Sequence, residues 1–424
     1  MSAEHWPRVK VSELCDLIVD CVNKTAPSIE NETPYKMIRT PNIKNGKIDL
    51  AGCRYVEKET YEKWTRRATV DKGDVLLTRE APMGEVGLVN FEDTVFLGQR
   101  IMQYRANPKK LDSNYLLYAF LSPNLQYQFR KHDSTGSIVS HIRVPDCSEF
   151  EISTPPLGMQ KKISKVLRDI DDKIELNNRI NAELEAMAKT LYDYWFVQFD
   201  FPNDNGKPYK TSGGKMVYNP TLKREIPGGW EAGTLEELGQ IVGGSTPTTQ
   251  NPENFMAKGT PWITPNDLSN NQGNKFISRG GQDVSAEGIK SASLKKYPAG
   301  TVLLSSRAPI GYMAISRNEV TTNQGFKSFI PNKGYSSEFI YYAVKNSLKS
   351  ITLYASGSTF KEVSASTLKT VKVVLPRVNM SDAFTEKVKP IFLQQDILER
   401  ENAQLAQLRD WILPMLMNGQ VKVS

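Results

Sequence analysis

Residues 303–311 read LLSSRAPIG, a short apolar run followed by Ser305, Ser306 and Arg307 and then by Ala-Pro-x-Gly. The leucines are typical of a buried strand and the last four residues of a turn, so the two serines and the arginine are expected at the strand end. A guanidinium there carries a fork of donors that matches the O6 and N7 acceptors of guanine. The alternative is structural, with Arg307 in a surface ion pair or packed against the turn.

The same phrase occurs at residues 76–84 as LLTREAPMG, 227 positions earlier. Here Arg79 precedes Glu80, and Glu80 occupies the position of Arg307. A carboxylate can accept a hydrogen bond from N4 of cytosine, but neighbouring phosphates would repel it. We therefore favour a structural role for Glu80.

Two further motifs are duplicated, namely TPN at 40–42 and 264–266, and STGS at 134–137 with ASGS at 355–358. The asparagine of TPN can read N6 and N7 of adenine or cap the next element, and capping is the commoner use. Small hydroxyl residues around a glycine are typical either of a simple turn or of a nest of N–H groups that holds a phosphate.

The elements that position these residues also repeat, since Trp6 and Trp230 begin the two copies and offsets drift between 221 and 227. Both copies mix short apolar runs bounded by Gly, Pro and Asn with helical stretches. Each copy is followed by a heptad pattern typical of a long helix that packs on another helix. The seam of the first helix comprises Leu167, Ile170, Ile174, Asn177, Asn181, Leu184, Ala188, Leu191 and Trp195.

Adding 221 gives the second seam, namely Phe384, Val388, Ile391, Gln395, Leu398, Asn402, Leu405, Arg409, Ile412 and Leu416. Asn181 and Asn402 occupy equivalent positions, where asparagine either fixes the register of the pair or faces solvent. We prefer the register role. Residues 201–230 are rich in Pro, Gly and Asn and resemble a connector rather than a core element.

The sequence thus predicts an α+β protein with two mixed α/β domains, two long helices packed as an antiparallel coiled coil, and a pseudo-twofold internal repeat. The expected boundaries are 1–156 and 231–377 for the globular domains, 157–200 and 378–424 for the helices, and 201–230 for the linker.

Composition narrows the class of protein. Residues 201–377 carry 21 Lys+Arg against 12 Asp+Glu, a balance compatible with a polyanionic partner. No apolar run is long enough for a membrane helix or a signal peptide, so we expect a cytoplasmic protein without membrane contact. The four cysteines lack C-x-x-C spacing, and neither a disulfide framework nor a metal site is expected.

This order of domains and helices resembles the specificity subunit of type I restriction-modification systems. The resemblance covers essentially the whole chain, with the TPPLGMQKKISKVLRDIDDKIELNN run in the first helix and GGSTPT, PWITPNDL, LLSSRAPIG and TNQGFKSF in the second domain. It implies that each globular part is a target recognition domain that reads one half of a bipartite site in double-stranded DNA. It also implies that the helices set the spacer and dock two modification subunits. Those methyltransferase subunits would carry S-adenosylmethionine, and restriction subunits with translocase and nuclease activity would join them.

Under this interpretation, the candidate DNA-binding residues are Thr40, Asn42, Arg79, Gln99, Ser137, Thr264, Asn266, Ser305, Ser306, Arg307, Gln324, Lys327, Ser358 and Lys361. No catalytic residue is expected, because the chain has no P-loop, no Asn/Asp-Pro-Pro-aromatic motif and no glycine-rich cofactor loop after a strand. Two alternatives stay open: a coiled-coil scaffold without DNA specificity of its own, and a self-contained DNA methyltransferase, which would need those motifs.

Overall fold

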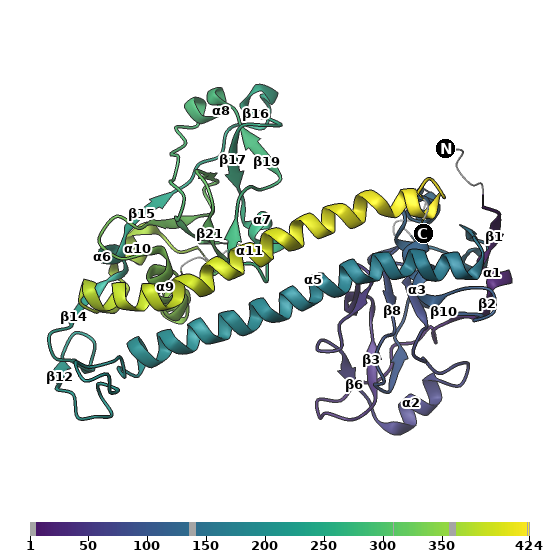
Figure 1. The fold of residues 1–424 in the computed structure, drawn as a ribbon, viewed down its shortest axis with the longest axis horizontal. Helices are drawn as coiled ribbons and strands as arrows, with labels where there is room; N and C mark the ends of the chain where they lie inside the picture. Colours follow the sequence, from purple (N-terminus) through teal and green to yellow (C-terminus); the bar gives the residue numbers. More distant parts are fainter. Residues whose placement is uncertain (1–5, 135–140, 308, 356–361, 422, 424) are drawn as a thin grey trace. The chain divides into compact units, whose positions relative to one another are not determined.

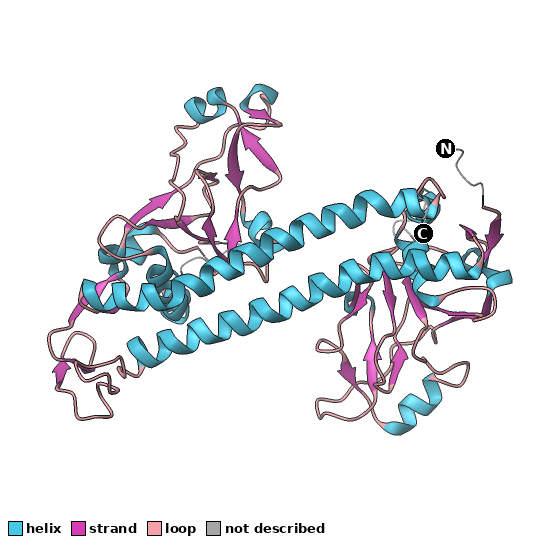
Figure 2. Cartoon of the chain, in the orientation of Figure 1, coloured by secondary structure: helices cyan, strands magenta, loops and turns pink. Residues whose placement is uncertain are grey.

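A computed structural model of the chain describes residues 6–134, 141–307, 309–355, 362–421 and 423. The chain forms two compact units, residues 1–174 with 403–424, and residues 175–402. Each long helix therefore contributes one part to each unit. The globular parts mix strands with short helices, whereas the long helices are uninterrupted (Figure 2).

The first unit is built around a four-stranded antiparallel sheet in the order β2-β10-β7-β8, formed by Cys15–Asp20, Ile101–Ala106, Val75–Thr78 and Val86–Leu88. A second sheet, β6-β3-β9, comprises Arg54–Tyr55, Lys36–Ile38 and Val95–Leu97. Two-stranded pairs are formed by β1 and β11 (Arg8–Lys10 and Glu151–Ser153) and by β4 and β5 (Ile43–Lys44 and Lys47–Ile48). The helices are α1 Val11–Leu14, α2 Lys58–Trp64, α3 Ser113–Leu121 and α4 Pro123–Arg130.

The second unit has a five-stranded sheet in the order β15-β23-β20-β21-β18, formed by Gln240–Gly243, Lys327–Ile330, Val302–Leu304, Met313–Ser316 and Phe276–Ile277. A four-stranded sheet, β16-β19-β17-β22, comprises Phe255–Met256, Gln282–Val284, Thr260–Ile263 and Thr321–Thr322. The remaining strands form the pairs β12 with β13 (Met216–Asn219, Arg224–Pro227) and β14 with β24 (Glu231–Thr234, Lys372–Leu375). The helices are α6 Leu235–Leu238, α7 Pro265–Asn270, α8 Ala286–Ser291, α9 Ser337–Leu353 and α10 Ala365–Thr370.

The two units repeat one topology, which confirms the predicted internal repeat. The order β2-β10-β7-β8 corresponds to β15-β23-β20-β21, and in each unit the smaller sheet contains one parallel pair, β3 with β9 or β17 with β22. The helices α3 and α9 pack on these sheets (Figure 1), and both begin at a side-chain cap. Asp112 accepts from the N–H of Tyr115, and Ser336 accepts from the N–H of Phe339.

The two long helices are α5, Leu157–Tyr192, which continues into a π-helical turn at Asp193–Val197, and α11, Val378–Met417. None of the predicted seam residues on either helix is exposed. In the second unit Asn177 contacts Asn402, and Tyr192 packs against Phe384, so the helices run antiparallel. In the first unit Asp171 of α5 pairs with Arg409 of α11. The predicted antiparallel helix pair is confirmed.

The seam asparagines differ from each other in their contacts. Asn402 accepts from Nδ2 of Asn177 at 2.9 Å and donates to Oδ1 of Asn178 at 2.8 Å. Asn181 meets the other helix through its backbone carbonyl, which accepts from Gln395 at 3.2 Å, while its own Oδ1 is buried with no partner among the described residues. Side-chain bonds across the helix pair therefore support a register role for Asn402, whereas Asn181 does not pair with it.

The prediction that residues 201–230 form a connector rather than a core element is wrong. Phe201, Ile226 and Trp230 are buried in the core of the second unit, together with residues of α9 and α11. Aromatic stacking of Phe201 on Trp230 and the β12-β13 hairpin fix the segment. The Pro, Gly and Asn content reflects tight turns, and the large apolar side chains between those turns make the segment part of a core.

Candidate nucleic-acid interface

The LLSSRAPIG phrase begins as β20 and is followed by a turn whose side-chain hydrogen bonds come from Ser305. The Ser305 hydroxyl donates to the carbonyl of Pro309 at 2.7 Å and accepts from the N–H of Tyr312 at 2.9 Å. Ser306 is held on both sides, because its N–H donates to Gly325 at 2.8 Å and its carbonyl accepts from Val363 at 3.0 Å. Arg307 is thus the first residue whose side chain leaves the buried strand.

The first unit builds the same turn with the same hydrogen bonds. Thr78 takes the place of Ser305 and accepts from the N–H of Glu85 at 2.9 Å. The N–H of Arg79 donates to Arg100 at 2.7 Å, and the carbonyl of Arg79 accepts from Ile142 at 3.0 Å. This pattern makes Arg79 equivalent to Ser306, and Glu80 equivalent to Arg307.

Both turns also require their glycine. Gly84 and Gly311 have φ values of +88° and +104°, in the left-handed region where a side chain would be strained. The glycine at the end of the duplicated phrase is therefore explained by backbone geometry.

Three predicted contact residues are used inside the domains. Ser305 and Ser306 are fully buried, so their assignment as DNA contacts is corrected to a structural role. Arg79 donates from Nη1 to the carbonyl of Ile142 at 3.0 Å, and its Nε is buried without a partner among the described residues. In the structure its guanidinium holds the segment around Ile142, and DNA contact by Arg79 stays a prediction.

The two TPN turns use their asparagines differently. Asn42 is buried and accepts from the N–H of Arg39 at 2.9 Å, which is the capping role. In the second copy Asp267 takes that role by accepting from the N–H of Thr264 at 2.7 Å, and Asn266 is exposed on α7. Asn266 is therefore the better candidate for contact with a base.

The TPN turns lie beside the Ala-Pro turns. In the first unit the hydroxyl of Thr40 donates to the carbonyl of Ala81 at 2.9 Å. In the second unit a Cβ placed on Gly325 would lie 3.0 Å from Pro265 and 3.5 Å from Nε of Arg307. The fold thus brings the TPN turn to the Ala-Pro turn in each domain.

The predicted glutamines have equivalent partners. Gln99 accepts from the hydroxyl of Thr25, and Gln324, next to Gly325, accepts from the hydroxyl of Thr246. Both bonds orient an amide near the turns. Ser137, Ser358 and Lys361 lie outside the described residues.

Ion pairs at these turns involve residues that sequence reasoning missed. Glu362 lies 3.7 Å from Arg307 and 3.7 Å from Lys327, and in the first unit Arg100 pairs with Glu80. The signal in the sequence was weak, since Glu362 aligns with His141 at the offset of 221 and shares no chemistry with it.

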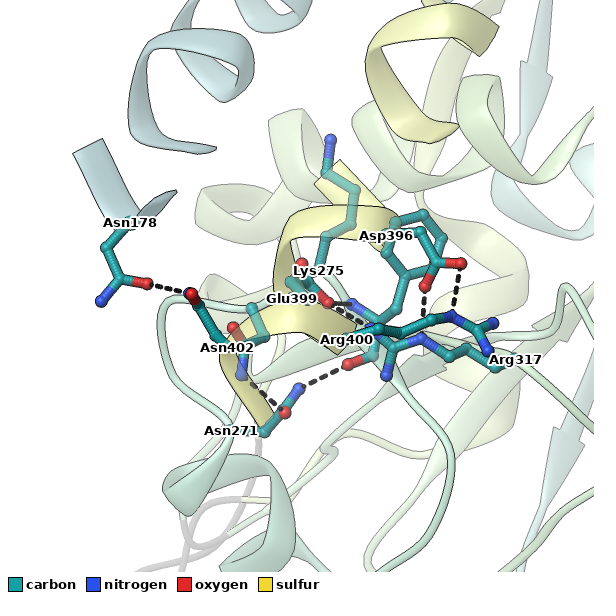
Figure 3. Close-up of polar contacts among 10 residues, drawn as sticks. Asn178, Asn271, Lys275, Arg317, Asp396, Glu399, Arg400 and Asn402 are labelled. Atoms are coloured by element: carbon teal, nitrogen blue, oxygen red, sulfur yellow. Dashed lines mark hydrogen bonds and ion pairs between the residues drawn. The ribbon is translucent and has the colours of Figure 1, made fainter. Parts of the chain in front are cut away.

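A buried polar network connects the globular part of the second unit to both long helices, and Figure 3 shows its contacts with α11. Lys275 lies just before β18, and its ammonium group contacts Glu185 of α5 at 2.7 Å and Gln395 of α11 at 2.7 Å. Glu399 of α11 accepts from the backbone N–H groups of Lys275 and Phe276 at 2.6 and 3.1 Å. Arg317 adds a bond to Glu399 at 2.7 Å and an ion pair with Asp396.

Burial dominates the electrostatics of this network. It lowers the pKa of Lys275 to about 8, although Glu185 opposes the shift. For Glu185, burial raises the pKa, but Lys275 and Lys345 more than offset it and the net shift is downward. Burial also raises the pKa of Glu399, against the opposing effect of its N–H donors and Arg317. These groups hold the globular part of the second unit to the helices.

Within the part of the chain that the structure describes, no group of three or more His, Cys, Asp or Glu residues could hold a metal ion. All four cysteines are free. No described helix is both long enough and apolar enough to span a membrane.

Comparison with known proteins defines the class. The model of the type I restriction modification DNA specificity domain matches the chain twice, at residues 3–186 and 227–407. The HindI specificity subunit of Haemophilus influenzae is 26% identical over 409 residues, covering 84% of this chain and 88% of that protein. The MjaIX specificity subunit of Methanocaldococcus jannaschii is 38% identical over 198 residues, 45% of each protein.

Among solved structures, the S subunit of a type I restriction-modification system from M. genitalium has a TM-score of 0.56 at 17% identity, covering 98% of this chain and 96% of that one. This likeness concerns the fold. The chain belongs to the family of type I restriction modification DNA specificity proteins.

Proposed function

We propose that this chain is the sequence-specific DNA recognition subunit of a type I restriction-modification complex, in which each recognition domain reads one half of a bipartite, asymmetric site. The observation that carries the proposal is the duplicated turn, because both domains build it with the same backbone hydrogen bonds yet place different charges on it, Glu80 in one and Arg307 in the other. A common scaffold with different exposed side chains suits two half-sites of different sequence.

The proposed chemistry lies in the partner subunits. Modification subunits would bind S-adenosylmethionine and methylate adenine, restriction subunits would translocate and cleave DNA, and this chain would catalyse nothing itself. Mapping of methylated adenines across the genome of a strain that expresses the chain with its modification subunit tests the proposal. A bipartite motif with a fixed spacer is the expected result, and methylation that does not change when this chain is omitted would contradict it.

We expect two modification subunits to bind one copy of this chain. Met187 on α5 and Leu408 on α11 are 60% and 43% exposed, and they are equivalent under the offset of 221. The heptad pattern also predicts Tyr194 beside the seam on this surface, but its side chain packs against the core of the second unit. Exposed apolar side chains at equivalent helix positions would give each modification subunit the same contact.

Native mass measurement of the purified complex checks this stoichiometry. Met187→Glu and Leu408→Glu should each remove one modification subunit, and the double variant should remove both. A wild-type complex that contains a single modification subunit as its only species would contradict the twofold docking.

We also expect the helices to set the spacer. An insertion after Ala186 alone would displace Glu185 from Lys275 and Lys345 in the globular part of the second unit, so matched heptads after Ile174 and Asn402 are the better change. Seven residues add about 10 Å at a rise of 1.5 Å per residue. The recognised spacer should lengthen by about three base pairs, with unchanged half-sites. Methylation mapping measures both, and altered half-site bases with the original spacer would refute the ruler role.

A further inference from the structure

Glu362 and Arg307 form a paired surface that the sequence did not indicate. The two residues are directly opposite in an antiparallel bridge, which the adjacent bond from Val363 to Ser306 holds in register. Opposite residues in such a bridge project their side chains from the same face. A guanidinium donor and a carboxylate acceptor are therefore displayed side by side.

The contact within this pair leaves both groups able to bind a ligand. One oxygen of Glu362 lies 3.7 Å from Nη1 of Arg307 and the other lies 3.7 Å from Nζ of Lys327, and both distances exceed hydrogen-bond length. The side chains of Arg307 and Glu362 are 35% and 42% exposed, whereas that of Lys327 is 15% exposed. Arg307 and Glu362 face solvent, and Lys327 lies behind them.

Space is also left next to the arginine. Residue 325 is a glycine, and a Cβ there would already lie 3.1 Å from Oδ1 of Asn323 and 3.5 Å from Nε of Arg307. The neighbour of Arg307 on this side is therefore bare backbone, and Gln324 and Asn266, which adjoin Gly325 and Pro265 in the chain, are exposed. A flat ligand can then approach the guanidinium fork.

The first domain places the same two side-chain types at its own turn, but from different positions. There the carboxylate belongs to Glu80, which is equivalent to Arg307, and the guanidinium belongs to Arg100. Arg100 is equivalent to Gly325, because the carbonyl of each accepts a hydrogen bond from the backbone N–H of the residue before the turn. Both domains therefore display a donor beside an acceptor at this turn, from non-equivalent positions.

In the major groove a G·C base pair presents the acceptors N7 and O6 of guanine next to the N4 donor of cytosine. We propose that Arg307 and Glu362 together read one such base pair, with the guanidinium donating to guanine and the carboxylate of Glu362 accepting from N4 of cytosine. Lys327, 3.7 Å from the other carboxylate oxygen, holds Glu362 in place. This inference rests on the proposed function, since it adds Glu362 as a second residue that contacts the base pair read by Arg307.

The test uses the full chain in complex with modification subunits and a panel of DNA duplexes that carry every single-base substitution in both half-sites. Glu362→Ala should lower discrimination at one G·C pair by about tenfold or more, and at the same pair as Arg307→Ala. Glu362→Gln keeps an acceptor oxygen without the charge, so it should retain most of that discrimination. Glu80→Ala is the matched control, and its effect should fall in the other half-site.

In the opposing model, Glu362 occupies the place of a DNA phosphate and shields the positive charges of Arg307 and Lys327 when no DNA is bound. In that case Glu362→Ala and Glu362→Gln would both bind every sequence more tightly, with a salt dependence steeper by about one. That result overturns the inference, as does a Glu362→Ala complex that discriminates like wild type. A wild-type complex that binds all sequences alike would overturn the proposed function as well, so the two failures are distinguishable.

Discussion

Replacing Glu399 with alanine should lower the free energy of unfolding of the second unit by about 3–5 kcal/mol. The Glu399 carboxylate, 3% exposed, accepts from the backbone N–H groups of Lys275 and Phe276 at the start of β18 and from Arg317. Alanine would leave all three donors without this acceptor in a buried site, and unsatisfied buried donors and charges are among the most costly defects in a folded protein.

Urea titration of the full chain measures this loss, with amide hydrogen exchange over residues 260–330 used to follow the second unit separately. Glu386→Ala is the matched control, because Glu386 is exposed on the same helix and its removal should change stability by less than about 0.5 kcal/mol. Equal stability of the two variants would show that Glu399 does not anchor the domain.

The repeat and the helix pair could be predicted from sequence because their signals are local or periodic. The heptad seams follow from the spacing of apolar residues alone, and every seam residue is at least partly buried. The duplicated turn was likewise visible, since its glycine is demanded by a positive φ and its small hydroxyl residue by bonds that close the turn. Such constraints act within a few residues.

The network around Lys275 could not be predicted in this way. It joins Lys275 to Glu185 and Gln395, which lie 90 and 120 residues away, and only the fold brings the three side chains together. A lysine after NQGN in a polar stretch gives no sign of burial. Long-range polar contacts carry no periodicity, so sequence reasoning assigns such residues to the surface.

The candidate site was predicted in part for the same reason. Arg307 was identified because it follows a buried strand, and the structure keeps its side chain at the surface. Ser305 and Ser306 were assigned to the same edge, but both residues are fully buried just after β20 ends at Leu304. Glu362 reaches Arg307 only through a bridge between distant segments. The sequence indicated that an arginine lies at this turn, but it did not indicate that Glu362 is the residue opposite it.

Arg307→Ala should weaken binding to the preferred DNA sequence by about 1–3 kcal/mol and relax discrimination at one base pair. A neutral methyl group removes both donors that match guanine, while the turn itself stays intact because its hydrogen bonds come from the backbone and from Ser305. The partly exposed pair with Glu362 contributes little to stability, so the fold should be unaffected.

The loss should be confined to the half-site read by residues 231–377, since the other recognition domain uses its own turn. Affinity for single-base variants of both half-sites at two salt concentrations measures this, with Lys349→Ala as a control that removes one exposed positive charge elsewhere in the same domain. A phosphate contact would behave differently, because it would weaken binding to all sequences alike and reduce the salt dependence by about one. If Arg307→Ala keeps wild-type discrimination at every position, the arginine serves only the turn, and the edge formed by the duplicated phrase does not read bases.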